Sequence, residues 1–208
     1  MGCTVKVTCH TQPGCRPIGG NVTRLTRSAA SGEWSWAVLP PLPAGAARNA
    51  VDCALWDLEA KRFAMPVWKL ANLTKAPEAV TTAYTISLGA PEAMAASARA
   101  NAHRPLMKLK LTGEGDLERV SAVREAAPDT ALIVDANEGW NPDQVEPFSA
   151  ALAKLGVQLI EQPLPADRDE ALASLSHPVP ICADESAHAR HGLEQLIGRY
   201  DVINIKLD

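Results

Sequence analysis

The sequence predicts an α/β protein organised around a parallel sheet, and two features of residues 105–208 indicate this fold class. Short apolar runs rich in Val, Ile and Leu recur there, and each ends at a charged residue. Successive charged residues are roughly 25 positions apart, about the length that one strand, one helix and two short loops require. An apolar run that stops at a polar residue is typical of a buried parallel strand with its functional side chain at the C-terminal end. The charged residues are Lys110, Asp135, Glu161, Asp184 and Lys206.

Residues 1–43 show no regular hydrophobic period, and we expect them to form an irregular segment. This segment contains four side chains of the types that bind zinc, Cys3, Cys9, His10 and Cys15. Their spacing does not match the short Cys-x-x-Cys patterns of tetrahedral sites. Irregular chain is therefore favoured over a metal site.

Residues 44–80 are expected to be a helical linker. A proline-rich run at residues 39–45 precedes a predicted helix from Ala46 to about Arg62, in which Ala, Leu and Trp make a wide apolar surface. Residues 81–89 then have the Thr, Tyr and Ile content of a first strand. This strand opens the last predicted region, residues 81–208.

Strands and helices alternate through that region. Helices are predicted from Pro91 to about His103 and over residues 116–127, 142–155, 168–175 and 192–199. Predicted strands lie between them at residues 105–111, 132–136, 158–161, 180–184 and 201–207. Six strands with intervening helices and no hairpin signal indicate a parallel sheet with right-handed crossovers.

The composition excludes several classes of protein. The 208 residues are 47% hydrophobic and 21% charged, which is typical of a globular protein with one large domain, or one domain and a fragment. The formal charge of −4 argues against a nucleic-acid surface, and no apolar run is long enough to cross a bilayer. Five cysteines without framework spacing, and an N-terminus without a secretory signal, predict a cytoplasmic protein.

The period of a strand places the charged residues on one face of the sheet. Side chains two positions apart share a face, so Lys108 and Lys110 point the same way, and this face gathers three carboxylates and three lysines in all. Close carboxylates raise one another's pKa unless cations lie between them, and an all-oxygen ligand set favours Mg²⁺ or Mn²⁺ over zinc. Each acid taken alone is also compatible with a helix cap or a solvated loop position, as Asp184 is before the helix that follows it.

The motifs at these strand ends resemble a known family. They are MKLKL, VDAN, EQP, ADES and NIKLD, and they follow the segments AGAARNAVDCALWDLEAK and TAYT. Together they resemble the enolase superfamily in its muconate-lactonising subgroup, and most closely the dipeptide epimerases of the L-alanyl-D/L-glutamate type. The resemblance extends from about residue 44 to residue 208.

The resemblance implies a fold and a set of roles. The fold is a modified TIM-type (β/α) barrel, incomplete here at about six strands, with a remnant of an N-terminal capping domain. The substrate is a small molecule, a dipeptide or another carboxylate. Lys110 and Lys206 would be the acid/base residues on its opposite faces, and Lys108 an electrostatic partner. The implied Mg²⁺ ligands are Asp135, Glu161 and Asp184.

The chemistry of epimerisation agrees with these roles. A proton next to a carboxylate is weakly acidic, and its removal makes a dianionic enediolate that only concentrated positive charge can stabilise. A lysine that acts as the base at pH 7 needs a pKa about three units below its ordinary value. The charges of Lys108 and of a bound metal would lower the pKa of Lys110 in this way. Two lysines on opposite faces of the α-carbon would then allow removal from one face and return to the other.

Two alternatives stay open. A sister enzyme of the subgroup would share every motif quoted, and the candidates are a muconate cycloisomerase, an o-succinylbenzoate synthase and an N-acylamino acid racemase. The other alternative is an inactive truncated homologue. Six strands cannot close an eight-stranded barrel, so we expect the first and sixth predicted strands to keep edges that favour aggregation or a homo-oligomer, with little activity from the chain alone.

Overall fold

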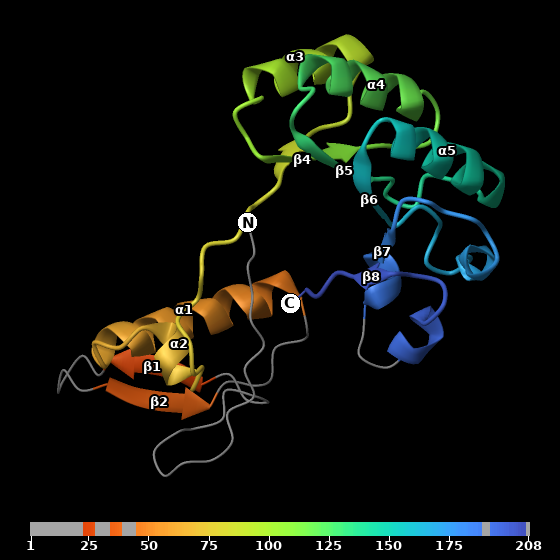
Figure 1. The fold of residues 1–208 in the computed structure, drawn as a ribbon. Helices are drawn as coiled ribbons and strands as arrows, with labels where there is room; N and C mark the ends of the chain where they lie inside the picture. The colour runs from red at the N-terminus through yellow and green to blue at the C-terminus, as the bar shows by residue number, and fades with distance from the viewer. Residues whose placement is uncertain (1–22, 28–33, 39–44, 189–191, 207–208) are drawn as a thin grey trace. The chain divides into compact units, whose positions relative to one another are not determined.

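The structure is a computed structural model that describes residues 23–27, 34–38, 45–188 and 192–206 (Figure 1). The chain forms two compact units. One contains residues 1–79 with residues 206–208, and the other contains residues 80–205. Among the described residues, no helix has both the length and the apolar character needed to span a membrane.

The first unit contains a hairpin and two helices. Strands β1 (Thr23–Arg27) and β2 (Trp34–Val38) pair antiparallel, with Leu25 opposite Trp36. Helix α1 (Ala46–Arg62) begins after Gly45 and has Lys61 and Arg62 in its last turn, where cations stabilise the negative end of the helix dipole. Helix α2 (Val67–Leu70) follows.

The prediction of irregular chain across residues 1–43 is therefore wrong for the two strands of this hairpin. The helix predicted from Ala46 to about Arg62 is confirmed. The zinc ligands considered at Cys3, Cys9, His10 and Cys15 lie outside the described residues.

The second unit is built on a parallel sheet of six strands in sequence order, β3 to β8 (Figure 1). Every neighbouring pair is parallel, so the predicted α/β fold with six parallel strands is confirmed. The strands are β3 (Tyr84–Ile86), β4 (Leu106–Lys110), β5 (Ala131–Asp135), β6 (Val157–Glu161), β7 (Ile181–Ala183) and β8 (Val202–Ile203). The outer strands β3 and β8 are shorter than the predicted runs 81–89 and 201–207.

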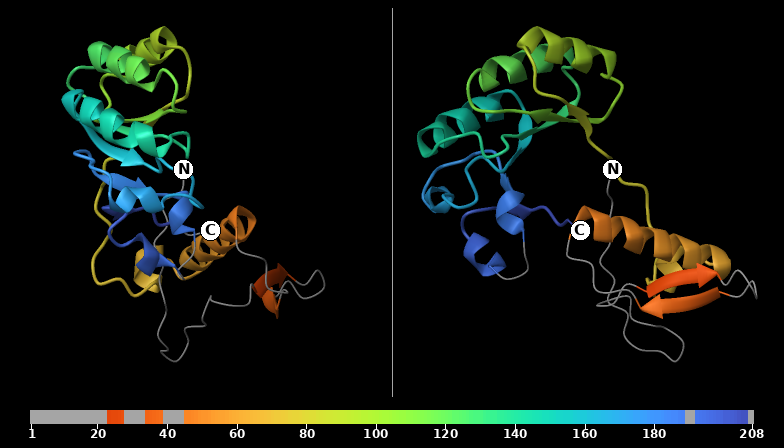
Figure 2. Two further views of the ribbon diagram at one scale, coloured as in Figure 1. Left: turned by 90° about the vertical axis from the view of Figure 1, so that its right-hand side faces the viewer. Right: turned by 180° about the vertical axis from the view of Figure 1, so that it is seen from behind.

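Three helices cover one side of this sheet (Figures 1 and 2). They are α3 (Pro91–Ala100), α4 (Asp116–Ala126) and α5 (Pro142–Lys154). In the described part of the later connections, the helical elements are short 3₁₀ turns, η1 (Glu170–Ala173), η2 (Glu185–Ala187) and η3 (Leu193–Leu196). The α-helices predicted over residues 168–175 and 192–199 are thus wrong in type and length. Prolines at 163, 165, 178 and 180 crowd the first of these connections and cannot donate backbone hydrogen bonds.

The core lies between the sheet and these helices. Met107 and Leu109 of β4 are fully buried, whereas Lys108 and Lys110 between and beyond them are only half-buried. This alternation shows the period of two that predicts which side chains share a face. The apolar positions of the strands therefore pack on the helices, and the lysines point to the other face of the sheet.

Candidate active site

The charged strand ends lie side by side because the strands are parallel and in register. Lys110 at the end of β4 is paired with Asp135 at the end of β5, and Asp135 is paired with Glu161 at the end of β6. Glu161 is in turn paired with Cys182 of β7, and Asp184 follows immediately after that strand. The C-terminal ends of the strands thus form one polar edge, which is where α/β proteins place their reactive groups.

Two lysines and two carboxylates make direct contacts at this edge. Lys108 Nζ lies 2.8 Å from Asp135 Oδ2 and 2.6 Å from Glu161 Oε2. Lys110 Nζ lies 2.7 Å from Asp135 Oδ2 and donates a 3.1 Å hydrogen bond to Asn137 Oδ1. The side chains of Asp135 and Glu161 are only 1% and 6% exposed. The carboxylates of these ion pairs are buried although the lysines are half-buried, so removing a lysine leaves an uncompensated buried charge.

The surroundings move the pKa values of these groups in different directions. Burial raises the pKa of Asp135, but hydrogen bonds and charges from Lys108 and Lys110 outweigh it, and the net pKa is lowered. Burial also raises the pKa of Glu161, and the negative charges of Asp135 and Asp184 add to this, so its pKa stays raised despite Lys108. Burial lowers the pKa of Lys108, yet its bonds to Asp135 and Glu161 leave the net pKa raised. At Glu161, burial and the neighbouring carboxylates together outweigh the effect of Lys108.

The same two influences, burial and nearby carboxylates, act on the thiol of Cys182 in β7. Burial, followed by the charges of Glu161 and Asp184, raises the pKa of Cys182 to about 12. Asp184 is thus close enough to affect both Glu161 and Cys182. The structure brings together Lys108, Lys110, Asp135 and Glu161 by direct contact, with Asp184 in electrostatic range. Lys206 is three residues past β8 and belongs to the other compact unit, so its role stays a prediction.

Two asparagines at this edge had no role assigned from the sequence. Asn204 Nδ2 donates a 2.7 Å hydrogen bond to Glu161 Oε1. Asn137 accepts from Lys110, and its backbone N–H donates to Asp135 Oδ1 at 3.0 Å. Both residues share a face with the neighbouring charged residue by the period of two, and that signal was available in the sequence. The positive φ of 46° at Asn137 is a rare conformation for a residue other than glycine and is typical of functional sites.

The carboxylates fit a divalent cation. Among the described residues, no three Asp, Glu, His or Cys side chains already converge as a metal cluster, and Lys108 bridges Asp135 and Glu161. The donors are nevertheless all oxygen, as Mg²⁺ and Mn²⁺ prefer. Asp135, Glu161 and Asp184 lie near two lysines at this edge, Lys108 and Lys110, so the formal charges of these five groups leave one negative charge that a further cation would offset.

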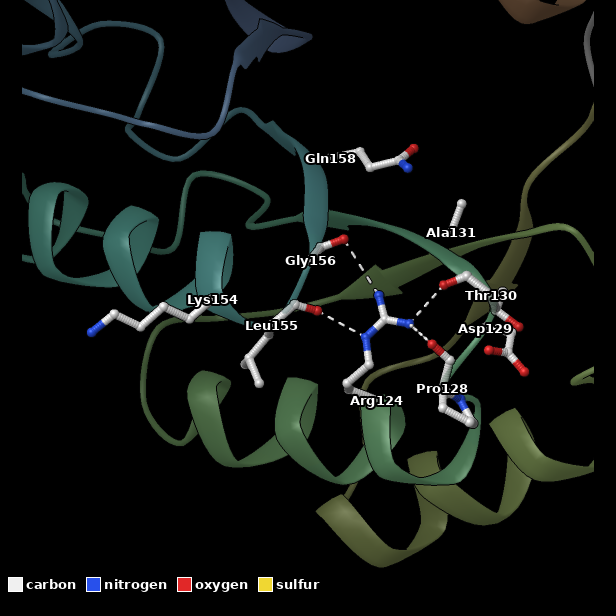
Figure 3. Close-up of a pocket in the computed structure, with 9 residues that line it drawn as sticks. All are labelled: Arg124, Pro128, Asp129, Thr130, Ala131, Lys154, Leu155, Gly156 and Gln158. Carbon is white, nitrogen blue, oxygen red and sulfur yellow. Dashed lines mark hydrogen bonds between the residues drawn. The ribbon is translucent and has the colours of Figure 1, made fainter.

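The pocket drawn in Figure 3 lies at the opposite ends of the strands. It is lined by the start of β5, the turn before β6 and the last turns of α4 and α5, with Arg124 at its centre. None of the predicted site residues lines it. Arg124 donates hydrogen bonds to carbonyl oxygens of both loops there, so the arrangement indicates a structural clamp.

Comparison with known proteins gives two family matches. Residues 92–208 match the enolase C-terminal domain-like family. Residues 20–71 match the N-terminal domain of mandelate racemase and muconate lactonizing enzyme, a match that includes part of the segment expected to be irregular.

Among curated proteins, the chain is 52% identical over 169 residues to L-Ala-D/L-Glu epimerase of Escherichia coli (strain K12), covering 80% of this chain and 52% of that protein. It is 48% identical over 167 residues to N-acetyl-D-glutamate racemase of Pseudoalteromonas sp., with the same coverage of each. The chain therefore spans about half the length of these relatives.

Among solved structures, one match is an enolase family member from Agrobacterium tumefaciens with homology to dipeptide epimerases, solved with bound sodium and L-Ala-L-Glu. It has 53% sequence identity to this chain and a TM-score of 0.75. That match covers 80% of this chain and 51% of the other. The dipeptide epimerase of Cytophaga hutchinsonii, complexed with Mg and D-Ala-L-Val, has 31% identity and a TM-score of 0.66, covering 74% of this chain and 44% of the other.

Proposed function

We propose that this chain, which belongs to the enolase C-terminal domain-like family, carries the metal and acid–base site of an L-Ala-D/L-Glu dipeptide epimerase. The observation that carries the proposal is the contact set at the strand ends. Lys108 lies between the buried carboxylates Asp135 and Glu161, and Lys110 lies beside them. The 52% identity to an epimerase of this specificity supports the choice of substrate.

Three carboxylates of the chain would hold the cation, Asp135, Glu161 and Asp184. A bound Mg²⁺ or Mn²⁺ would act as a Lewis acid toward the substrate carboxylate. Asn204 fixes one oxygen of Glu161 through its hydrogen bond. The carboxylates are thereby restrained in orientation before any ligand arrives, which is the preorganisation that electrostatic catalysis requires.

The lysines would divide the proton transfer between the two faces of the α-carbon. Lys110 would take the α-proton from one face of one epimer, and Lys206 would deliver a proton to the opposite face to give the other epimer. In the reverse direction the two lysines would exchange these roles. Lys108 would remain an ammonium group that stabilises negative charge. In the present contacts Lys110 Nζ is held by Asp135 and Asn137, so both residues aim the amine.

Calorimetric titration of the full chain with Mg²⁺ tests the metal site. The parent should bind, and Glu161→Gln should weaken binding at least tenfold, because it removes a charge from a ligand. The exposed Glu125 on α4 provides a matched control, and Glu125→Gln should bind as the parent does. Equal affinity of Glu161→Gln and parent would refute the assignment.

Solvent exchange tests the two lysines. In D₂O, Lys110→Ala and Lys206→Ala should each lose epimerisation, yet each should retain exchange of the α-hydrogen in only one of L-Ala-L-Glu and L-Ala-D-Glu. Exposed Lys154 serves as the control, because Lys154→Ala should leave exchange of both epimers unchanged. The same exchange pattern in both site variants would remove the two-base mechanism.

A second candidate substrate is an N-acylated glutamate. The 48% identity to an N-acetyl-D-glutamate racemase favours it, and its α-carbon carries the same proton next to a carboxylate. Assays of both substrates with the same preparation would separate the two candidates. The predicted cytoplasmic location fits either reaction.

A further inference from the structure

Gln162 occupies an unusual position directly after Glu161. Its side chain is completely buried, and its backbone has a positive φ of 35°, a conformation that is unfavourable for a residue other than glycine and that surrounding contacts must hold. Its backbone N–H donates to Cys182 O at 2.8 Å, and its carbonyl accepts from Glu138 N at 2.9 Å. Surrounding bonds therefore hold Gln162 in place between the loops that follow β5 and β7.

The side-chain amide of Gln162 connects the end of β6 to the segment that carries Asp184. Its Oε1 accepts from the backbone N–H of Asp184 at 2.8 Å and of Ser186 at 3.1 Å. Its Nε2 carries two protons and lies 2.8 Å from Leu164 O, 2.8 Å from Ser186 Oγ and 2.9 Å from Tyr200 OH, so the two hydroxyl oxygens share one proton of the amide. One amide thus fixes both the backbone and a side chain of the Asp184–Ser186 turn.

The carboxylate of Asp169 determines which way this amide faces. Asp169 is 1% exposed and pairs with Arg199 at 2.7 Å. Its Oδ2 accepts from Ser186 Oγ at 2.6 Å and from Tyr200 OH at 2.7 Å. The hydroxyls of Ser186 and Tyr200 have one proton each, and both protons point to Asp169. Toward Gln162 the two hydroxyl oxygens can therefore only accept a hydrogen bond, so the NH₂ group of the amide must face them. A flipped amide would instead place its NH₂ group against two backbone N–H groups, leaving buried donors without acceptors.

We propose that Gln162, oriented by Asp169 through Ser186 and Tyr200, is a positioning residue that holds Asp184 for binding a divalent cation. The inference rests on the proposed metal site and adds residues to which that proposal gives no part. Gln162 adjoins Glu161 in sequence and binds the backbone of Asp184, so it sets the relation between two of the three carboxylates. The ligand is a divalent cation with a preference for oxygen donors, as the carboxylates require.

Two variants of the full chain test this positioning. Gln162→Met keeps the length of the side chain and removes the hydrogen bonds of the amide at both Oε1 and Nε2, and Mg²⁺ affinity measured by calorimetry should fall at least tenfold. Ser186→Ala removes only the hydroxyl and should lower the affinity severalfold. The control is Ser149→Ala, because Ser149 is also buried and its Oγ accepts from Val179 N. Ser149→Ala should lower the melting temperature without changing Mg²⁺ affinity.

Hydrogen exchange of the Asp184 amide, followed by NMR without metal, makes the test independent of the proposed function. Protection of this amide should fall in Gln162→Met and Ser186→Ala and stay at the parent value in Ser149→Ala. A parent chain that binds no Mg²⁺ would refute the proposed metal site, and unchanged amide protection in both variants would separately overturn the positioning. Mg²⁺ affinity equal to the parent in Gln162→Met would overturn it as well.

Discussion

Replacing Arg124 with Met should destabilise the second unit without affecting the metal site. The Arg124 guanidinium donates to five backbone carbonyls, and the distances to Leu155 O, Thr130 O and Pro128 O are 2.8, 2.8 and 2.9 Å. The other two distances are 3.2 and 3.4 Å. Each short bond is worth about 1 kcal/mol net, since water can reach some of these carbonyls at the pocket surface (Figure 3). The expected loss is about 3 kcal/mol.

A loss of this size should lower the melting temperature by roughly 10 °C in a domain of this length, measured by circular dichroism and calorimetry. Arg99→Met makes the same substitution at an exposed position in the last turn of the neighbouring helix α3 and should change melting little. Arg124→Lys keeps the charge but not the planar group of five donors, and should fall between the two. The clamp interpretation fails if Arg124→Met melts within about 2 °C of the parent.

Two further predictions concern a close backbone contact and a buried thiol. A Cβ added at Gly139 would lie 2.7 Å from Thr112 C and O, so Gly139→Ala should lower the free energy of unfolding in urea by about 1 to 3 kcal/mol. The control is Gly89→Ala, whose Cβ would lie 3.8 Å from Met94 and whose stability should stay within about 0.5 kcal/mol of the parent. Equal effects of the two substitutions would contradict the close contact at Gly139. Burial raises the pKa of Cys182 to about 12, so little of this thiol is thiolate at pH 9. Mass spectrometry of the native protein at pH 9 should therefore show slow alkylation of Cys182 and fast alkylation of the exposed Cys53. Equal alkylation rates would contradict the burial of Cys182.

The strand ends were predictable because a strand has a period of two and parallel neighbours align. The segments MKLKL and ALIVD show in the sequence which residues alternate between the two faces of the sheet. The prediction that Lys110 and Asp135 share a face is confirmed by their pairing in the register of β4 and β5. The hairpin at β1 and β2 had a signal that the prediction missed. Trp34 and Trp36 alternate with small residues, and the SAASG run before them contains the Ser-Gly signal of a turn.

The network around Gln162 had no comparable signal. Its amide bonds residues 24 and 38 positions away, and Asp169 bonds Tyr200 across 31 positions. These partners lie on connections between strands, where no period relates one residue to another. Such contacts follow from tertiary packing. From the local sequence pattern alone, a Gln directly after a strand can be predicted only to lie in a turn.

The two lysines of β4 differ in their contacts, and the difference bears on the roles proposed for them. Lys108 lies between two carboxylates, and its pKa is raised because these contacts outweigh the lowering by burial. A lysine with a raised pKa stays protonated throughout the physiological range, so these contacts favour an electrostatic role for Lys108 over the role of a base in the proposed reaction. It can stabilise negative charge at every stage of the reaction, which is the electrostatic role that the resemblance implies. Lys110 contacts only one of the two carboxylates and a neutral amide. In the proposed reaction the base on this strand would therefore be Lys110, at its C-terminal end.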